Sequence, residues 1–578
     1  MSVDPADPRA FTQAPRLRLP SGFQLILLIV GVLVAGTVAA ALGRLALWSW
    51  DEFGTGIPDY YVDQVFRNAA VRRTLVNTAI VVVVSSTLAT FVASILAWLN
   101  ERTDASIGTV GRVMPLVPFL MPALAMPLGW LFLASPTAGA LNVIIRSGLD
   151  QVGIEKTTGP LDINSWPGLI FLYTIFLCGF AYLVVSSSMR SLDSGLEEAA
   201  KLAGAGAVRT LFQVVLPALR PAMISAFLMC LIVAVAMVSV PITIGSAANI
   251  SILSVLLVNL VISQSPPQYG QAFLLGLFML IPILFAWWLQ RRSAVRGRFA
   301  MIGGKGVGGV HLKLGRWKKH VGRSIFIGYG LVAVVLPLLG LLYVSGMSFW
   351  SGEWPSDWNP IENMRAAIND PVIRKSIVTS VELGILAGAT MVVIAHLMSY
   401  GQRLYPRLGQ SVDGLAKVPT VVSHILIAIA LLVTLGGAPF RLGNTPWLLF
   451  IGYLVIFIPF ASVLMTGAHQ EIGRDMVEAA KLSRASDART FRSIVTPLTR
   501  PALVAAFLLM YVLVSGETNL SLILANTDRP VVGFVMLDLF NFASFPKVAS
   551  FALLITAVNL TCVAIFMKLF TGRRIGDR

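Results

Sequence analysis

The fold of this chain is decided by a stretch that its sequence contains twice. Residues 197–221 read EEAAKLAGAGAVRTLFQVVLPALRP, and residues 477–501 read VEAAKLSRASDARTFRSIVTPLTRP. The two copies align without a gap at a spacing of 280 residues. Both are polar, and both stand between long apolar runs. A repeat that stays in register over this length indicates that the chain consists of two equivalent halves.

The composition predicts a membrane protein. Of the 578 residues, 56% are hydrophobic and only 12% are charged, whereas a soluble domain has about 25% charged residues. A helix that crosses a bilayer needs roughly 20 apolar residues, and the sequence contains many such runs. A transmembrane β-barrel would need segments of about 10 residues with alternating polarity, but runs such as residues 79–99 are apolar on all sides. We therefore expect an all-α, polytopic membrane protein.

About twelve apolar runs fall into two groups of six. They lie at about 24–48, 75–99, 110–134, 167–187, 222–246 and 270–290, and then at about 325–347, 376–398, 413–435, 446–467, 502–525 and 549–570. We expect a first half over residues 24–290, with its repeated loop near 190–221, and a second half over 325–570, with its loop near 470–501. An even number of spans gives both halves one orientation. Two six-helix bundles, related as parallel repeats, would then enclose a central pathway.

The distribution of charge predicts the side of the membrane for each loop. Residues 291–323, within the linker 291–324, contain ten Lys or Arg residues and no acid, so the linker is expected in the cytoplasm. Counting six spans outward places the tails 1–23 and 571–578, and both repeated loops, on the same side. Topology explains the net charge of +16 without a nucleic-acid partner, although a basic linker can also bind anionic lipid or nucleic acid. The acidic, aromatic stretches 50–66 and 351–364 are expected outside, where a partner could contact them.

The repeated loop itself predicts a short, two-part helical hairpin on the cytoplasmic surface. Residues 198–202 are strong helix formers, Gly204 and Gly206 bend or end that helix, and Pro217 and Pro221 mark the return into the bilayer. A single amphipathic loop is common between membrane helices and would not by itself indicate a docking site. Two copies at equivalent positions imply two equivalent docking sites.

These residues resemble the EAA loop of the ABC importer permeases. The family pattern is E-A-A, three residues, G, and an apolar stretch that ends in L-P, and residues 198–217 of the first loop match it throughout. The fused two-half layout and the motif AWLNERTD at 97–104 are most similar to the ferric-iron-type permeases, a group that includes thiamine and some organophosphonate importers. The resemblance implies a multi-pass protein of the bacterial inner membrane. It also implies that each loop forms a coupling helix that docks in a cleft of a separate ATPase subunit.

The resemblance assigns coupling roles to matching residues in both loops. They are Glu198, Ala199, Ala200, Lys201, Gly204, Arg209 and Pro217 in the first loop, and Glu478, Ala479, Ala480, Lys481, Arg484, Arg489 and Pro497 in the second. Arg484 stands where the family has glycine. The second loop therefore lacks the residue that favours a tight turn, and we expect the two coupling sites to be unequal.

The chain itself is not expected to be an enzyme. Residues 303–306 read GGKG but lack the spacing and the Ser or Thr of a nucleotide-binding P-loop, and the five histidines and three cysteines show no metal-ligand spacing. We expect the chain to bind no metal or cofactor. ATP and Mg would be used by two copies of an ABC ATPase subunit, and an extracytoplasmic solute-binding protein would deliver the solute, with membrane lipid surrounding the chain.

One polar run lies at membrane depth. Glu517, Thr518 and Asn519 interrupt an apolar stretch, and Met237 is the repeat partner of Glu517. A carboxylate at this depth usually faces the protein interior, a water-filled cavity or a partner. Glu517 could therefore line the translocation pathway and favour a cationic solute, or it could be hydrogen-bonded for helix packing. Iron-type relatives often carry an acid at the place of Met237, which weakens the assignment of iron.

The sequence thus favours the permease subunit of an ATP-driven importer that works by alternating access, with ferric iron as the leading solute. Thiamine, a polyamine-like amine or an organophosphonate are alternative solutes. A secondary transporter driven by an ion gradient also uses repeats and broken helices, but it needs no paired docking loops. A non-transporting scaffold would leave the repeat unexplained.

Overall fold

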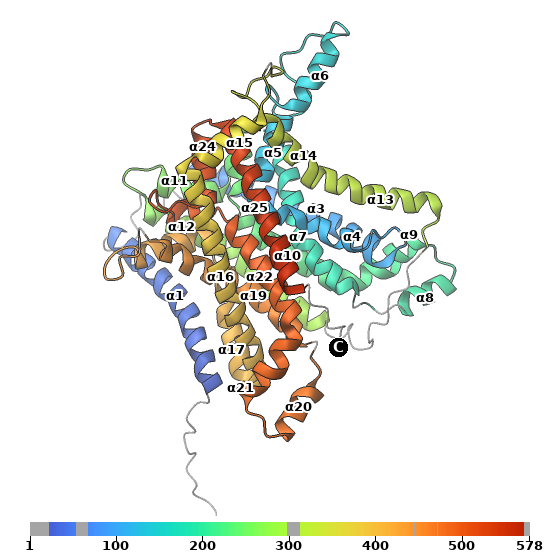
Figure 1. Ribbon diagram of the computed structural model, residues 1–578, viewed down its shortest axis with the longest axis vertical. Helices are drawn as coiled ribbons and strands as arrows, with labels where there is room; N and C mark the ends of the chain where they lie inside the picture. Colours follow the sequence, from blue (N-terminus) through green and yellow to red (C-terminus); the bar gives the residue numbers. More distant parts are fainter. Residues whose placement is uncertain are drawn as a thin grey trace, which may run out of the picture.

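The computed structural model describes residues 22–53, 67–297 and 313–571, apart from residues 191, 193, 194, 356, 444 and 471. All regular elements in these ranges are helices (Figure 1). Nine of the described helices are long and apolar enough to cross a membrane, or up to eleven if each of two bent pairs is one span. The all-α, polytopic fold is confirmed. The count of twelve spans stays a prediction, and the two tails, most of the outer loop 50–66 and the middle of the linker lie outside the described residues.

The repeat read from the sequence is a repeat of structure. The C-terminal part of each half has the same order of elements: a long span, two short helices, a π-helical turn and a second long helix. In the first half these are α7 (Trp166–Arg190), α8 (Gly195–Leu202), α9 (Ala207–Thr210), the turn Leu211–Val215 and α10 (Leu216–Ala236). In the second half they are α19 (Pro446–Gln470), α20 (Arg474–Leu482), α21 (Asp487–Thr490), the turn Phe491–Val495 and α22 (Thr496–Ser515).

An insertion changes the register of the repeat. The long helices α3 (Ala69–Arg102) and α16 (Pro371–Leu404) have equal lengths, but their last arginines, Arg102 and Arg403, are 301 residues apart rather than 280. The extra residues of the first half lie before α7, where the chain forms α6 (Ala140–Asp150) and a following loop. Figure 1 shows α6 projecting at one end of the molecule, opposite to α20.

The first helix of each half packs on the other half. Helix α1 (Gly22–Phe53) lies against α17 (Pro406–Ala416) and α18 (His424–Leu435) of the second half. Helix α14 (Leu336–Ser345), which continues α13 (Arg316–Gly330), packs on α5 (Ala125–Ala134) of the first. The two halves therefore exchange their first helices, an arrangement that the sequence did not predict.

The crossing of α5 and α14 is close because both helices present glycine there. A Cβ atom added to Gly129 would lie 2.3 Å from the carbonyl oxygen of Pro337, and one added to Gly340 would lie 2.2 Å from the carbonyl oxygen of Gly129. Only a residue without a side chain allows such an approach in a membrane-embedded interface. The two halves are thus locked together at backbone distance.

Four apolar runs that the sequence predicted as single spans are broken. Residues 109–134 form α4 (Thr109–Val113), a 3₁₀ turn (Met114–Leu120) and α5, with a bend of 90°. Their equivalents, α17, the turn Val418–Val421 and α18, bend by 97°. The prolines in both turns remove backbone donors that a straight helix needs. Helices α10 and α22 likewise end at Ala236 and Ser515, inside the predicted spans 222–246 and 502–525.

The remaining described helices include one further candidate span, α25 (Phe545–Thr571), and several helices with shorter apolar stretches. They are α11 (Leu253–Ile262), α12 (Tyr269–Gly297), α15 (Pro360–Asn369), α23 (Ser521–Leu524), α24 (Val532–Asn541) and α25. Helix α12 extends into the predicted linker, and α13 begins within it. The linker is therefore shorter than its sequence suggested.

Candidate functional site: paired coupling hairpins and the broken helices beneath them

The two repeated loops form matching helical hairpins, α8–α9 and α20–α21. Glu198 and Glu478 are exposed on the first limb of each hairpin. Ala199 and Ala479 are also exposed, whereas Ala200 is half-buried and Ala480 is buried. The backbones of Lys201 and Lys481 lie in α8 and α20. The structure thus gives the first limbs the same exposed acidic and small-residue surface.

Both hairpins turn in the same way, although only one has a glycine at the turn. Gly204 has φ +79°, and Arg484 adopts the same left-handed conformation with φ +55°. The amide of Ala205 donates to the carbonyl of Ala200 at 3.0 Å, and the amide of Ala485 donates to that of Ala480 at 3.0 Å. The doubt about a tight turn at Arg484 is therefore resolved: the turn forms, in a backbone region that costs a non-glycine residue about 1–2 kcal/mol.

The second limb of each hairpin leads without a break into a long helix. Arg209 is exposed and donates from Nε to Gln213 Oε1 at 2.8 Å. Arg489 is also exposed, and its amide donates to the Ser486 side chain at 3.3 Å, which caps α21. Pro217 and Pro497 follow directly after the π-helical turns, near the start of α10 and α22. Each hairpin is therefore continuous with a long helix of the protein body.

Each hairpin also exposes large apolar side chains. Leu202 is 90% exposed and Leu482 is 87% exposed, and Leu196 and Met476 are more than 40% exposed. Beside Met476, a groove of about 430 Å³ is lined by residues of α20, α21 and the π-helical turn, including Ala479, Arg489 and Ile494. Exposed apolar side chains at equivalent places in two halves fit a surface that a partner covers.

The motif at residues 97–104 forms a charged cluster under the first hairpin. The carboxylate of Glu101 is buried, and its oxygens lie 3.2 Å from Arg112 Nε and Nη2 and 3.4 Å from Arg190 Nη1. Asp104 accepts a hydrogen bond from the Leu314 amide at 3.1 Å. The motif thus joins α3 to α4, to the end of α7 and to the segment before α13. The sequence signalled the motif by its charges at the end of an apolar run, but it did not reveal these partners.

Beside this cluster, Glu197 is buried at the start of α8. Its Oε2 lies 3.5 Å from Arg102 Nη1. Burial raises the pKa of Glu197 above its ordinary value, and the charge of Arg102 opposes that shift. The family pattern includes Glu198 but not this preceding acid, so the sequence did not single it out.

Glu517 lies at the break between α22 and α23, and it is buried. Its carboxylate accepts from the Leu520 amide at 2.9 and 3.1 Å, from the Ser521 amide at 3.1 Å and from the Ser521 hydroxyl at 3.1 Å. These donors cap the N-terminus of α23, where a negative charge is favourable. The geometry matches the packing alternative for Glu517, whereas its role in the pathway stays a prediction.

The neighbours of Glu517 connect the two halves. Asn519 Oδ1 accepts a hydrogen bond from the Val238 amide at 3.3 Å, directly after the broken end of α10. Met237, the C-cap of α10, is buried and its carbonyl accepts from Ser254 Oγ at 2.6 Å. Thr518 is buried as well. Asn519 of the second half therefore contacts Val238, the residue that follows Met237 in the first half.

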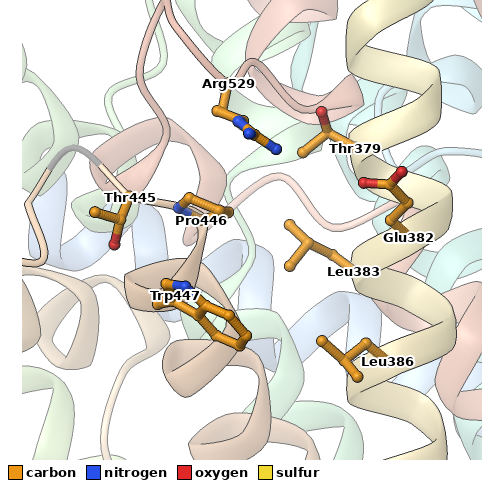
Figure 2. A pocket seen from close by; sticks show the side chains of 8 residues that line it. All are labelled: Thr379, Glu382, Leu383, Leu386, Thr445, Pro446, Trp447 and Arg529. Carbon is orange, nitrogen blue, oxygen red and sulfur yellow. The ribbon is translucent and has the colours of Figure 1, made fainter.

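A side pocket of about 430 Å³ lies on the second half, between α16, the start of α19 and the loop that follows α23 (Figure 2). Glu382 comes from α16 and Arg529 from the loop that follows α23, and Leu383, Leu386 and Trp447 form an apolar part of the lining. Both charged residues are exposed. This pocket opens on the flank of α16 and not at the contact of the broken helices.

Comparison with known protein families shows the family of this chain. The pattern of the family described as "Binding-protein-dependent transport system inner membrane component" matches residues 85–296 and again residues 383–576. The chain belongs to this family. It is the permease subunit of a binding-protein-dependent ABC importer, a multi-pass inner-membrane protein, and its two matches correspond to two fused permease halves.

Relatives of this permease match either most of the chain or a smaller part of it. The probable ABC transporter permease protein y4fN of Sinorhizobium fredii is 23% identical over 82% of this chain and 87% of its own length. The ferric transport system permease protein FbpB of Actinobacillus pleuropneumoniae is 19% identical over 98% of this chain and 85% of its own. The spermidine/putrescine transport system permease protein PotC of Haemophilus influenzae is 22% identical over 37% of this chain and 81% of its own. The relatives thus share the permease function but not one solute.

Proposed function

We propose that this permease imports ferric iron by alternating access, driven by two copies of an ABC ATPase subunit that bind the hairpins α8–α9 and α20–α21. The observation that supports the proposal is the pair of matching hairpins, each with an exposed glutamate and an exposed leucine at the same place. ATP and Mg belong to the ATPase. A solute-binding protein would deliver iron at the opposite end of the molecule, where α6 projects.

The proposed stroke follows from the continuity of the helices. Each hairpin runs through a π-helical turn into α10 or α22, and these helices end at Ala236 and Ser515 in the centre of the protein. Movement of the hairpins toward each other would shift both broken ends. The hydrogen bond between Asn519 and Val238 lies at this position, so a change in hairpin separation would open or close the contact between the halves.

Ferric iron is the leading solute because two ferric permeases match 90% or more of this chain, whereas the polyamine relatives match less than 40%. A polyamine-like amine is the second candidate, since permeases named for spermidine and putrescine are among the relatives. Thiamine and organophosphonates are supported as solutes only by the resemblance of the fused two-half layout. The Glu517 carboxylate accepts hydrogen bonds from its own chain, and a role of this residue in favouring a cationic solute stays a prediction.

The proposal is tested with cells that express the permease together with its ATPase and binding protein. Uptake of radiolabelled ferric iron, putrescine, thiamine and 2-aminoethylphosphonate is compared, and disulfide or bifunctional cross-links from Leu202→Cys and Leu482→Cys identify the bound ATPase. ATP-dependent uptake of iron with cross-links from both positions supports the proposal. Gradient-driven uptake by the permease alone in vesicles would instead indicate a secondary transporter.

A further inference from the structure

Two arginines occupy the same place in the two halves, at the C-terminal end of the long helices α3 and α16. Arg102 donates from Nε to the Met189 carbonyl at 3.1 Å and from Nη2 to the Leu192 carbonyl at 2.6 Å. Arg403 donates from Nη1 to the His469 carbonyl at 3.4 Å and from Nη2 to the Ile472 carbonyl at 2.9 Å. The acceptors match at the repeat spacing of 280, so the same contact is built twice.

These carbonyls lie where a transmembrane span passes into a coupling hairpin. Met189 and His469 are in the last turn of α7 and α19, and Leu192 and Ile472 lie just before α8 and α20. The last carbonyls of a helix have no partner within the helix, and a guanidinium can donate to two of them at once. Each arginine therefore fastens the root of a hairpin to a second span.

The first hairpin has an additional tie. Arg102 Nη1 lies 3.5 Å from Glu197 Oε2, with 2% and 0% of the two side chains exposed, so the arginine also holds the first limb, α8, by charge. At the repeat spacing the residue equivalent to Glu197 is Val477. In the described part of the second hairpin, a neutral hydrogen bond of 3.2 Å from the Tyr400 hydroxyl to the Asp487 carbonyl holds the second limb, α21.

We propose that Arg102 and Arg403 are positioning residues that hold the two coupling hairpins to the transmembrane body, and that the Arg102–Glu197 ion pair holds α8 more tightly than α20 is held. The significance for transport rests on the proposed function of the hairpins. In this arrangement α8 moves together with α3 and α7, whereas α20 has more freedom relative to α16. The two strokes of the importer would then be unequal.

The experiment compares the mobility of the two hairpins in the full-length permease. Cys178, Cys230 and Cys562 are replaced by alanine, a single cysteine is introduced as Leu202→Cys or Leu482→Cys, and each is spin-labelled in lipid nanodiscs. We expect a more mobile electron paramagnetic resonance line shape at position 482 than at position 202. Glu197→Gln is expected to shift the spectrum at 202 to the mobile shape and to leave the spectrum at 482 unchanged.

The reciprocal variant adds the missing acid. Val477→Glu is expected to shift the spectrum at 482 toward the restricted shape, because position 477 is the repeat equivalent of Glu197 and Arg403 is the counterpart of Arg102. Equal mobility at both positions in the parent protein, or a spectrum at 202 that Glu197→Gln leaves unchanged, would overturn the proposal. If Val477→Glu fails to fold, the proposal is still tested by the difference in mobility between positions 202 and 482 and by the Glu197→Gln variant.

The outcome is independent of the proposed coupling to an ATPase. The spectra are recorded without that subunit. A negative result would therefore refute the role of the Arg102–Glu197 ion pair and leave the cross-linking test of the hairpins unaffected. Conversely, a failure to cross-link an ATPase leaves the difference in mobility standing. In the complete importer, Glu197→Gln is expected to reduce the solute transported per ATP hydrolysed, whereas the control Glu382→Gln, at an exposed acid on the flank of α16, is expected to leave this ratio unchanged.

Discussion

Asn519 of the second half accepts a hydrogen bond from the backbone amide of Val238 in the first half, at 3.3 Å. Val238 is fully buried, and it directly follows the residue that ends α10. A helix that stops inside a protein leaves backbone groups that need partners. The second half supplies one of these partners, so the broken helices depend on the contact between the halves.

Asn519→Leu is expected to lower the free energy of unfolding by about 1–3 kcal/mol, because it leaves the buried Val238 amide without an acceptor. Thermal unfolding in detergent can be followed with a thiol-reactive dye, since Cys178 and Cys230 are buried. The control is Asn526→Ala, which removes an acceptor from an exposed loop. Equal melting temperatures for the two variants would contradict the assigned contact.

Changing both hairpin glutamates, Glu198→Lys with Glu478→Lys, is expected to reduce ATP-dependent uptake at least about tenfold while insertion into the membrane is retained. The reversed charges face the proposed ATPase surface, where like charges cost energy and misdirect docking. Uptake and membrane levels are measured in the same cells. Glu382→Lys, an equal change at an exposed acid on the flank of α16, serves as the control. Normal uptake in the double variant would refute docking at these positions.

Arg484→Gly is expected to stabilise the second hairpin by up to about 1 kcal/mol, because it relieves the left-handed backbone cost but increases the freedom of the unfolded chain. Hydrogen exchange of the Ala485 amide, which donates to the Ala480 carbonyl, reports the local stability. The mirrored change, Gly204→Arg, should accelerate exchange at Ala205. Faster exchange in Arg484→Gly would show that the arginine side chain holds the turn.

Gly129→Ala is expected to destabilise the protein by about 1–3 kcal/mol, because the new methyl group overlaps the backbone of α14. Gly328→Ala in the adjoining α13 meets no atom within 4 Å and provides the matched control. Expression level and melting temperature are compared for both. A melting temperature of Gly129→Ala equal to that of the parent protein would mean that the two halves separate easily at this crossing.

Glu517→Gln tests the two hypotheses for the buried acid. As a cap of α23 it should mainly affect stability, because glutamine keeps one acceptor oxygen but loses the charge that favours the helix N-terminus. The ratio of iron to putrescine uptake should then stay constant. A changed ratio, with an unchanged melting temperature, would assign Glu517 to the translocation pathway.

The pattern of residue types is enough to predict the class of the fold, the repeat and the exposed residues of the hairpins. Long apolar runs exclude a soluble fold, and local residues decide where a short amphipathic helix begins and turns. The register of the repeat also predicted that the hairpins would match. The absence of glycine at Arg484 left a tight turn of the second hairpin in doubt. The turn nevertheless forms, because neighbouring hydrogen bonds hold the arginine in a conformation that glycine adopts more easily.

The contacts between distant elements could not be predicted from the sequence and are seen in the folded chain. A membrane helix is equally apolar whether it packs on its own half or on the other half. The sequence therefore could not predict the crossing of α5 and α14. The breaks at Ala236 and Ser515 are likewise set by partners from distant residues, as Asn519 shows. The carbonyl groups that Arg102 and Arg403 hold have no signature in sequence, because every residue carries one and only the fold selects which are reached.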